Sequence, residues 1–251
     1  MLALLIFAAP ALADDDLMAE AQSWENQGQW ALAMSVYQKI LKHEPENVDA
    51  RYKLGLVELK ATMTDAAVEA FKEVMRLDPS HEQARDALEG IFVSKAIEAN
   101  GKGKPQDALR ALEEGVAASP SSATAHLELA RELKRQKQDD RAIAEYRTVI
   151  GADAEGSTAP LELGELYASK QQNAEAAAAF EEAVRRDPKN AQAQHGLGTA
   201  YAALGQRDKA IAALDQAMRY YMLAGQEDKA TTAMVAADKL KAQPPSSKPA
   251  H

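Results

Sequence analysis

The chain has 251 residues, is 46% hydrophobic and only 5% aromatic, and carries a formal net charge of −9. The negative charge argues against nucleic acid as a partner, because phosphate binding depends on clustered Lys and Arg. The sequence has no cysteine, which excludes a disulfide framework, a thiolate metal site and a cysteine nucleophile. Scarce aromatic residues and frequent alanine favour helix packing over β-sheet surfaces, so we expect an all-α fold.

The first thirteen residues form an apolar segment that ends in Ala11-Leu12-Ala13, ahead of three aspartates. This ending is typical of a cleavable secretory signal. A bilayer-spanning helix needs about 20 residues, so the segment is too short to be a stable membrane span. We expect cleavage near Ala13 and a periplasmic or secreted mature chain that begins at Asp14. No basic residue precedes the apolar run, which leaves open a start codon upstream of Met1, and an apolar first helix packed on the fold is the alternative.

A repeat of 34 residues organises the rest of the chain. Pro45 and Pro79 are 34 positions apart, and Pro120 and Pro188 are separated by 68, twice that interval. A fixed period in this range indicates a repeat array. In six predicted helices an alanine is followed four positions later by a large apolar residue, which puts both on one helical face. These pairs are Ala33 and Tyr37, Ala67 and Phe71, Ala108 and Leu112, Ala142 and Tyr146, Ala176 and Phe180, and Ala210 and Leu214.

Another helix precedes each of these six, and several of these first helices carry a leucine followed by a small residue. The clearest examples are Leu54-Gly55, Leu163-Gly164 and Leu197-Gly198, with Tyr167 and Tyr201 three positions after the last two glycines. With these motifs the sequence resembles the tetratricopeptide repeat (TPR) over about residues 14–242. The resemblance implies a right-handed superhelical α-solenoid of about six helix-turn-helix repeats plus a C-terminal capping helix.

Polar residues stand where the period requires helices to begin, and they can cap free backbone amides. We expect Asn47 and Asn190 to cap first helices, and Thr64-Asp65, Asp107, Asp139-Asp140, Asn173 and Asp208 to act at the second helices. We divide the array into repeats 14–47, 48–81, 82–122, 123–156, 157–190 and 191–224, with a capping helix at 225–242. Residues 243–251 are rich in proline and serine and are expected to be disordered.

The third and fourth repeats depart from the pattern. The third is seven residues longer than its neighbours, close to two helical turns, so we predict that its first helix runs from about Glu82 to Ala99. The extra turns could form a ledge for a partner or a harmless extension, and the extension is favoured because solenoids tolerate such insertions. The fourth repeat lacks the closing proline, and its residues 151–156 are the expected place for a bend.

Residues that could carry chemistry are scattered. The histidines His43, His81, His126, His195 and His251 do not share the short spacing of metal ligands. Gly101 and Gly103 lack the preceding strand of a phosphate-binding loop, and the serines lack the context of a nucleophile elbow. We therefore expect no metal, no cofactor and no catalytic residue.

In proteins that this chain resembles, the first helices of successive repeats line a concave groove that receives an extended peptide or a partner helix. We infer the groove residues from the face of each first helix that turns away from its own second helix: Tyr52, Leu56, Val93, Ile97, Leu127, Arg131, Leu161, Glu165 and His195, with Lys53 and Lys134 at the edge. Leu56, Ile97 and Leu127 could be core residues instead, and this alternative stays open. The clamp of lysines and asparagines found in chaperone-binding members is not reproduced, because Leu127, Arg131, Leu161 and Glu165 stand at the corresponding sites.

The resemblance implies a non-enzymatic interaction scaffold or adaptor of the cell envelope, with a peptide or partner protein bound in the groove. The alternative is a structural solenoid that assembles into a homo-oligomer through its terminal repeats. A repeat scaffold is generic, so the sequence does not name the partner.

Overall fold

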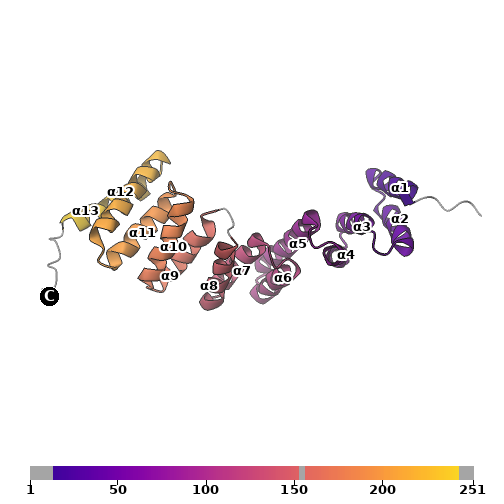
Figure 1. Ribbon diagram of the computed structural model, residues 1–251, viewed down its shortest axis with the longest axis horizontal. Coiled ribbons are helices and arrows are strands. Elements are labelled where there is room, and N and C mark those ends of the chain that lie inside the picture. The colour runs from indigo at the N-terminus through magenta and orange to yellow at the C-terminus, as the bar shows by residue number, and fades with distance from the viewer. Residues whose placement is uncertain (1–13, 153–155, 243–251) are drawn as a thin grey trace, which may run out of the picture. The chain divides into compact units, whose positions relative to one another are not determined.

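The computed structural model describes residues 14–152 and 156–242, and every regular element in these ranges is an α-helix. The predicted all-α architecture of consecutive helix pairs followed by a capping helix is confirmed (Figure 1). The helices are α1 (Asp14–Asn26), α2 (Trp30–His43), α3 (Val48–Lys60), α4 (Thr64–Leu77), α5 (Glu82–Gly101), α6 (Pro105–Ala118), α7 (Ala123–Arg135), α8 (Asp139–Gly151), α9 (Thr158–Ser169), α10 (Asn173–Arg186), α11 (Ala191–Ala203), α12 (Arg207–Leu223) and α13 (Glu227–Ala242). The predicted signal at 1–13 and tail at 243–251 lie outside the described residues.

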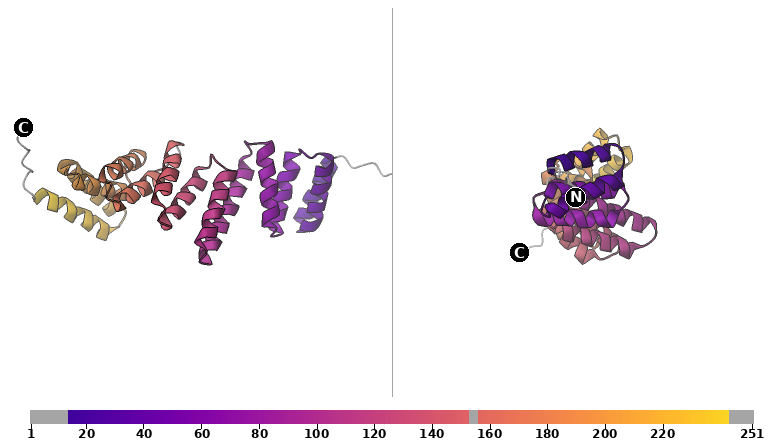
Figure 2. Two further views of the ribbon diagram at one scale, coloured as in Figure 1. Left: turned by 90° about the horizontal axis from the view of Figure 1, so that it is seen from below. Right: turned by 90° about the vertical axis from the view of Figure 1, so that its right-hand side faces the viewer.

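The helices belong to two compact units. Unit 1 ends at Pro120 and contains α1 to α6, and unit 2 begins at Ser121 and contains α7 to α13. Within each unit, the second helix of one pair packs against the first helix of the next, so α2 contacts α3, α4 contacts α5, α8 contacts α9 and α10 contacts α11 (Figure 2). Each pair therefore buries its apolar sides against adjacent pairs, as repeat proteins do.

The motif residues of the two helices meet inside each pair. Ala67 and Phe71 of α4 are fully buried, and a Cβ added to Gly55 of α3 would lie 2.7 Å from the Phe71 ring. Likewise, a Cβ added to Gly164 of α9 would lie 2.7 Å from the ring of Phe180 in α10. Glycine at this position therefore allows the first helix to lie directly against the large residue of the second.

Side-chain caps are found at the first helices. Asn47 and Asn190 each accept a hydrogen bond from the backbone amide three residues further on, as predicted. The second helices begin one to three residues earlier than the predicted caps require, so Met63 is the cap of α4 and Thr64 is already helical. Acidic residues such as Asp65 therefore lie in the first turn, where they act through the helix dipole instead.

The turn between the two helices of a repeat needs one residue in the left-handed region. Glycine fills this position in some repeats and a residue with a Cβ atom in others: Gly28, Gly103 and Gly205, but Thr62, Lys137 and Gln171 with φ near +60°. The left-handed conformation costs an L-residue about 1 kcal/mol or more, and a β-branched residue such as Thr62 is the least suited to it. The turn of the second repeat is therefore strained.

The seven extra residues of the third repeat extend α5, as predicted. His81 caps α5 as Asn47 caps α3, and Ala84 and Leu88 are buried as their equivalents in α3 are. The beginning of α5 therefore keeps the register of the other first helices, and the additional turns lie at its C-terminal end.

In the repeat without a closing proline, a side chain of another helix forms hydrogen bonds at the C-terminal end of α8. Arg186 of α10 donates hydrogen bonds from Nη2 to the carbonyl oxygen of Ile150, at 3.1 Å, and from Nη1 to that of Gly156, at 3.3 Å. The carbonyls at a helix C-terminus lack partners within the helix, and a guanidinium satisfies them well. The bend predicted at 151–156 falls partly on residues 153–155, which lie outside the described residues, so it stays a prediction.

Candidate partner-binding surfaces

A buried leucine fixes the register of five first helices. These leucines are Leu54 in α3, Leu88 in α5, Leu129 in α7, Leu163 in α9 and Leu197 in α11. At about 100° per residue, the side chains two positions before and two positions after each leucine point to the opposite side of the helix. We call these the outward positions. The predicted groove residues Tyr52, Leu56, Leu127, Arg131, Leu161, Glu165 and His195 all occupy them.

Helix α5 differs from that prediction. Its outward positions are Asp86 and Gly90, whereas the sequence pattern points to Val93 and Ile97, seven residues further along. The extra turns of α5 follow Leu88, at the C-terminal end of the helix. Seven residues make about two turns, so Val93 and Ile97 lie on nearly the same face as Asp86 and Gly90, but closer to the C-terminal end of α5. None of the nine predicted residues is buried, and the side chain of Ile97 is 67% exposed.

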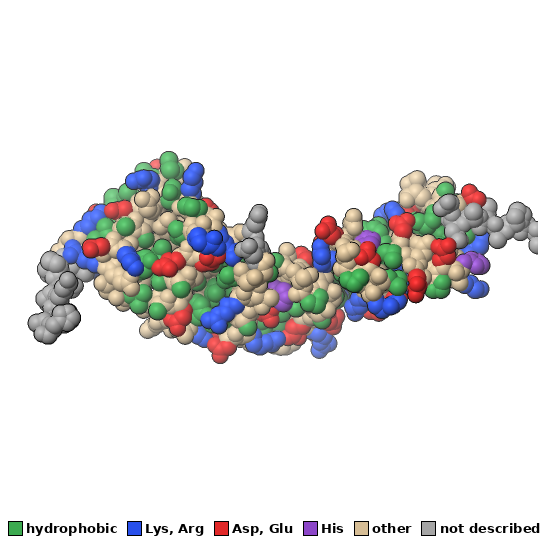
Figure 3. Space-filling model, viewed as in Figure 1, with side chains coloured by type: hydrophobic (Ala, Val, Ile, Leu, Met, Phe, Trp, Pro, Cys, Tyr) green, Lys and Arg blue, Asp and Glu red, His purple; other side chains and the backbone are tan. Residues whose placement is uncertain are grey.

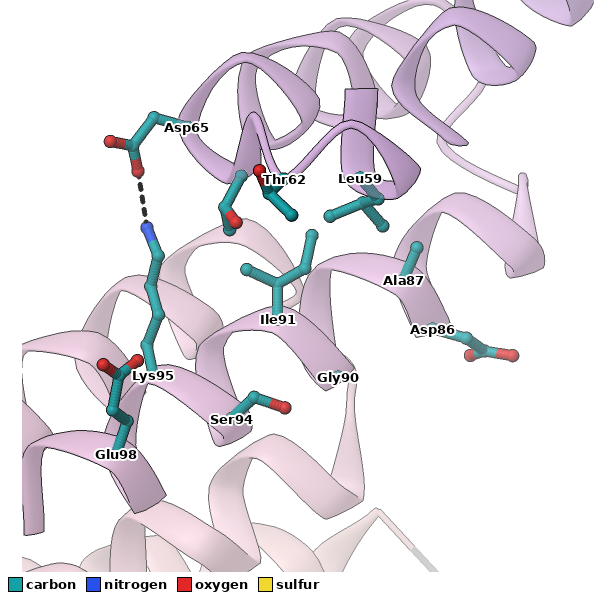
Figure 4. Close-up of a pocket in the computed structure, with 11 residues that line it drawn as sticks. Leu59, Thr62, Asp65, Asp86, Ala87, Gly90, Ile91, Ser94, Lys95 and Glu98 are labelled. Atoms are coloured by element: carbon teal, nitrogen blue, oxygen red, sulfur yellow. Dashed lines mark hydrogen bonds and ion pairs between the residues drawn. The ribbon is translucent and has the colours of Figure 1, made fainter. Parts of the chain in front are cut away.

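Unit 1 contains an open groove of about 770 Å³ between α5 and the turn that joins α3 to α4 (Figure 4). We call it the α5 groove. Its floor is formed by the apolar side chains of Leu59, Ala87 and Ile91. Ile91 is almost fully buried, while Leu59 and Ala87 are partly accessible. The groove therefore exposes an apolar strip without requiring the core to open.

Small side chains along α5 produce this groove. Ala87, Gly90 and Ser94 follow one another at spacings of three and four residues, so they lie along one side of the helix. A Cβ added to Gly90 would have no other atom within 4 Å, in contrast to Gly55, so this glycine makes no close approach. Glycine in a helix interior costs about 1 kcal/mol relative to alanine. This spacing of small residues was the signal in the sequence that could have indicated the groove.

The two ends of the α5 groove carry different charges. At one end, Lys95 donates a hydrogen bond from Nζ to Oδ1 of Asp65 in the first turn of α4, at 2.8 Å, and this ammonium holds the pKa of Asp65 below its usual range. At the other end lies Asp86 (Figure 4). Burial, and secondly the charge of Asp86, raise the pKa of Tyr52. The predicted residue Tyr52 therefore lies within electrostatic range of this end.

Tyr52 and Leu56 contribute to the core beside the groove. Both are half-buried and pack against the cluster that contains Phe71 and Leu88. The Tyr52 ring lies 5.7 Å from the Phe71 ring and 4.7 Å from the His81 ring, measured between centroids. These contacts hold both side chains in place while leaving part of each accessible.

In unit 2 the outward face is covered by polar side chains that pair with each other. Arg131 of α7 contacts Glu162 of α9 through Nη2 at 2.7 Å and through Nε at 3.0 Å. The hydroxyl of Tyr146 donates to the same carboxylate at 2.9 Å. The hydrogen bonds to Glu162 raise the pKa of Arg131, and burial together with Glu162 raises that of Tyr146. The guanidinium of Arg131 is therefore occupied by neighbours within its own unit.

Glu165, at an outward position of α9, also has partners on neighbouring helices. Glu165 of α9 forms an ion pair with Lys134 of α7 at 3.6 Å, and Gln192 of α11 donates a hydrogen bond to it. Together with Arg131 and Glu162, these residues form a polar ladder across α7, α9 and α11. The ladder joins successive first helices, so two of the predicted groove residues, Arg131 and Glu165, have partners already.

The remaining predicted residues of unit 2 flank the ladder. Leu127 and Leu161 are half-buried. His195 lies 6.2 Å from the ring of Tyr221 in an edge-on arrangement, and burial lowers the pKa of this histidine. Within unit 2, the predicted residues therefore lie on the outward side of successive first helices. On the face shown in Figure 3, side chains of both charge signs are interspersed over both units.

Within residues 14–152 and 156–242, no three His, Asp or Glu side chains lie where they could hold a metal ion. His126 and Glu145 form a close pair at 2.6 Å. No helix in the same ranges combines the length and apolar character that a bilayer crossing requires.

Comparison with known proteins identifies the family. Models described as tetratricopeptide repeat match residues 26–90 and 166–224, and a further one matches residues 94–158. Together these segments cover about three quarters of the chain. No curated protein matches the sequence.

Solved structures share the fold. YrrB, described as a TPR protein with an unusual peptide-binding site, is 18% identical with a TM-score of 0.52, over 79% of this chain and 97% of YrrB. Yeast Tom70 is 18% identical with a TM-score of 0.54, over 91% of this chain and 47% of Tom70. Repeats of this family are typically non-enzymatic and mediate contacts between proteins. The helix pairs, the leucine and glycine motifs and these matches show that the chain belongs to the tetratricopeptide repeat family.

Proposed function

We propose that this TPR scaffold docks an extended segment of a partner protein in the α5 groove of unit 1. The observation that carries the proposal is the contrast between Gly90 and its equivalents, Arg131 and Glu165. In unit 2, Arg131 pairs with Glu162 and Glu165 pairs with Lys134, and these side chains cover the outward face. At Gly90 no side chain is present, and the apolar floor beside it remains accessible. An apolar strip that is open in the free protein is typical of a binding surface.

The shape of the groove favours a peptide segment. From Asp86 to Glu98 it follows α5 over about 18 Å, at about 1.5 Å per residue. An extended peptide advances about 3.3 Å per residue, so five or six residues fill this length. The polar side chains at the rim, such as Asp65 and Ser94, are exposed to solvent. A small molecule usually needs enclosure by convergent polar groups, which this rim does not provide.

The cell envelope is the proposed location. The support for it is the sequence of residues 1–13, an apolar run that ends in Ala11-Leu12-Ala13. Expression of the full chain in a bacterium with a C-terminal tag, followed by fractionation and N-terminal sequencing, tests this part separately. We expect a periplasmic product that begins at Asp14. A cytoplasmic product that retains Met1 would contradict it.

Photo-crosslinking in intact cells tests the docking surface. A benzophenone amino acid is placed in the full chain at Ser94, on the rim of the α5 groove, and in a matched variant at Glu69, on the exposed side of α4. We expect Ser94 to give a discrete crosslinked product that Glu69 does not give, identified by mass spectrometry. Equal products at both positions, or none at Ser94, would contradict docking in the groove.

A second candidate function is self-association through the C-terminal helices. Among the described residues, four of the eight exposed large hydrophobic side chains lie on α12 and α13: Met222, Leu223, Met234 and Val235. Hydrophobic atoms are visible where α12 ends and α13 begins (Figure 3). Sedimentation of the full chain at rising concentration tests this candidate. Assembly that is lost in the variant Leu223→Ser with Val235→Ser would support it, and a monomer at all concentrations would exclude it.

A further inference from the structure

The charged residues at the α5 groove are unequally paired. The lining contains three carboxylates, those of Asp65, Asp86 and Glu98, and one ammonium, that of Lys95. Asp65 is paired with Lys95 at 2.8 Å, and Glu98 is paired with Lys102 on the next turn of α5. For Asp86 the described residues provide neither an ion pair nor a hydrogen-bond donor, and its side chain is exposed. One negative charge therefore remains available at one end of an apolar groove.

We propose, on the basis of the proposed docking function, that the α5 groove selects a partner segment with a basic residue and an aliphatic residue two positions apart. The Lys or Arg of the segment pairs with Asp86. The aliphatic side chain packs on Ile91 and Leu59. An extended backbone between them runs along Gly90, where the missing side chain leaves room for it.

The proposed separation of two positions is chosen to match the axial spacing of the two contacts along α5. Asp86 and Ile91 are five residues apart, which is about 7.5 Å along the helix axis. In an extended peptide, side chains at positions i and i+2 point to the same side and are about 6.6 Å apart. Neighbouring positions point to opposite sides, so a segment with the basic and aliphatic residues adjacent cannot place both in the groove at once.

The charges also determine which partners are disfavoured. Among the described residues that line the groove, Lys95 is the only cation, and its ammonium is already bound by Asp65. An acidic segment would meet Asp86 without a free counter-charge, and like charges placed together at an interface are unfavourable. The groove therefore discriminates by the sign of the partner's charge as well as by its apolar side chain.

A panel of fluorescein-labelled nonapeptides tests the inference by fluorescence anisotropy on the full chain. All are built from glycine and serine, with one arginine and one leucine two positions apart, in either order. The control peptides have the two residues adjacent, glutamate in place of arginine, or serine in place of leucine. We expect at least one of the two spaced peptides to bind at least fivefold more tightly than every control, with the difference shrinking as salt is raised. Equal binding of the arginine and glutamate peptides, or no binding by either spaced peptide, would overturn the inference.

Substitution of Asp86 tests the same contact from the protein side. The variant Asp86→Asn keeps the size of the side chain, and we expect about fivefold weaker binding of the spaced peptide, since exposed ion pairs contribute modestly. Asp86→Lys should weaken it further and should improve binding of the glutamate peptide. The matched control is Glu82→Gln, which removes an exposed charge from the first turn of α5 outside the groove. Unchanged binding in Asp86→Asn would overturn the inference, with circular dichroism showing that each variant is folded.

This result is separable from the docking proposal. If Ser94 captures a partner in cells and capture is unchanged in Asp86→Lys, docking in the groove stands and the basic–aliphatic selectivity is wrong. If Ser94 captures nothing more than Glu69 does, the docking function itself is wrong. Capture that is lost in Asp86→Lys and retained in Glu82→Gln supports both.

Discussion

Unit 1 and unit 2 use the same outward positions in opposite ways. In unit 2, Arg131 and Glu165 fill them and join α7, α9 and α11 through the polar ladder. In unit 1, α5 places Asp86 and Gly90 there, and the apolar floor of the α5 groove stays open. The packing inside the helix pairs is alike in both units, with glycine against a large residue. The comparison shows that the outward positions can hold either interlocking polar side chains or an open groove without a change in the packing of the helix pairs.

A large effect on stability is expected from Arg131→Gly, which gives unit 2 the outward residue of α5. Glycine in the helix interior costs about 1 kcal/mol. Loss of the contacts to Glu162 adds about 1 kcal/mol, because the guanidinium is partly exposed and screened. We expect the free energy of unfolding in urea to fall by about 2 kcal/mol. Arg131→Ala is the control that keeps helix propensity, and full stability in that variant would show that the ladder does not contribute.

The reverse exchange, Gly90→Arg, should close the α5 groove. Arginine favours helix, and Gly90 has open space around it, so the variant should fold with unchanged or slightly higher stability. We expect at least tenfold less photo-crosslinking at Ser94. Retention of the full crosslinking yield would mean that the partner does not run along Gly90.

A smaller effect distinguishes the two kinds of glycine in unit 1. Gly90→Ala should raise the free energy of unfolding by about 0.5 to 1 kcal/mol, because alanine favours helix and its Cβ meets no neighbour. Gly55→Ala is the matched variant of opposite sign, since its Cβ would lie 2.7 Å from the Phe71 ring and overpacking costs about 1 to 3 kcal/mol. Destabilisation by Gly90→Ala would show that this position is packed, and the groove would not be open as described.

The smallest expected effect on stability concerns the turn between α3 and α4, which forms one wall of the α5 groove. Thr62→Gly relieves a left-handed conformation but increases the freedom of the unfolded chain, and the two terms partly cancel. We expect a net gain of about 0.5 kcal/mol in thermal or urea unfolding. The equivalent change in unit 2, Lys137→Gly, should give less, because lysine is not β-branched. The opposite ranking would contradict the strain assigned to Thr62.

The sequence predicts the repeat well because the period, the glycines and the alanines act within one helix pair. Gly55 and Phe71 lie in adjacent helices, and their spacing alone indicates the contact. The groove is harder to predict because its walls come from different pairs. In α5 the sequence pattern indicates Val93 and Ile97, whereas the structure places Asp86 and Gly90 at the positions equivalent to Leu127 and Arg131. Contact of Val93 and Ile97 with a partner stays a prediction.

The polar ladder was also not predicted, for a related reason. Arg131 and Glu162 are far apart in the sequence, and each is an ordinary charged residue on an amphipathic helix. Only the relative placement of α7 and α9 shows that they pair. The expectation that Leu127, Leu161 and His195 contact a partner stays a prediction, because their half-buried state is compatible with either role.

Gly90 and Asp86 lie on the side of α5 that faces away from Leu88 and take no part in holding the helix pairs together. Substitutions at these positions are therefore nearly free of folding constraint, while those at Gly55 or Leu88 are not. For the proposed docking function, this means that the preference for one partner sequence over another can change by single substitutions, with each intermediate still folded.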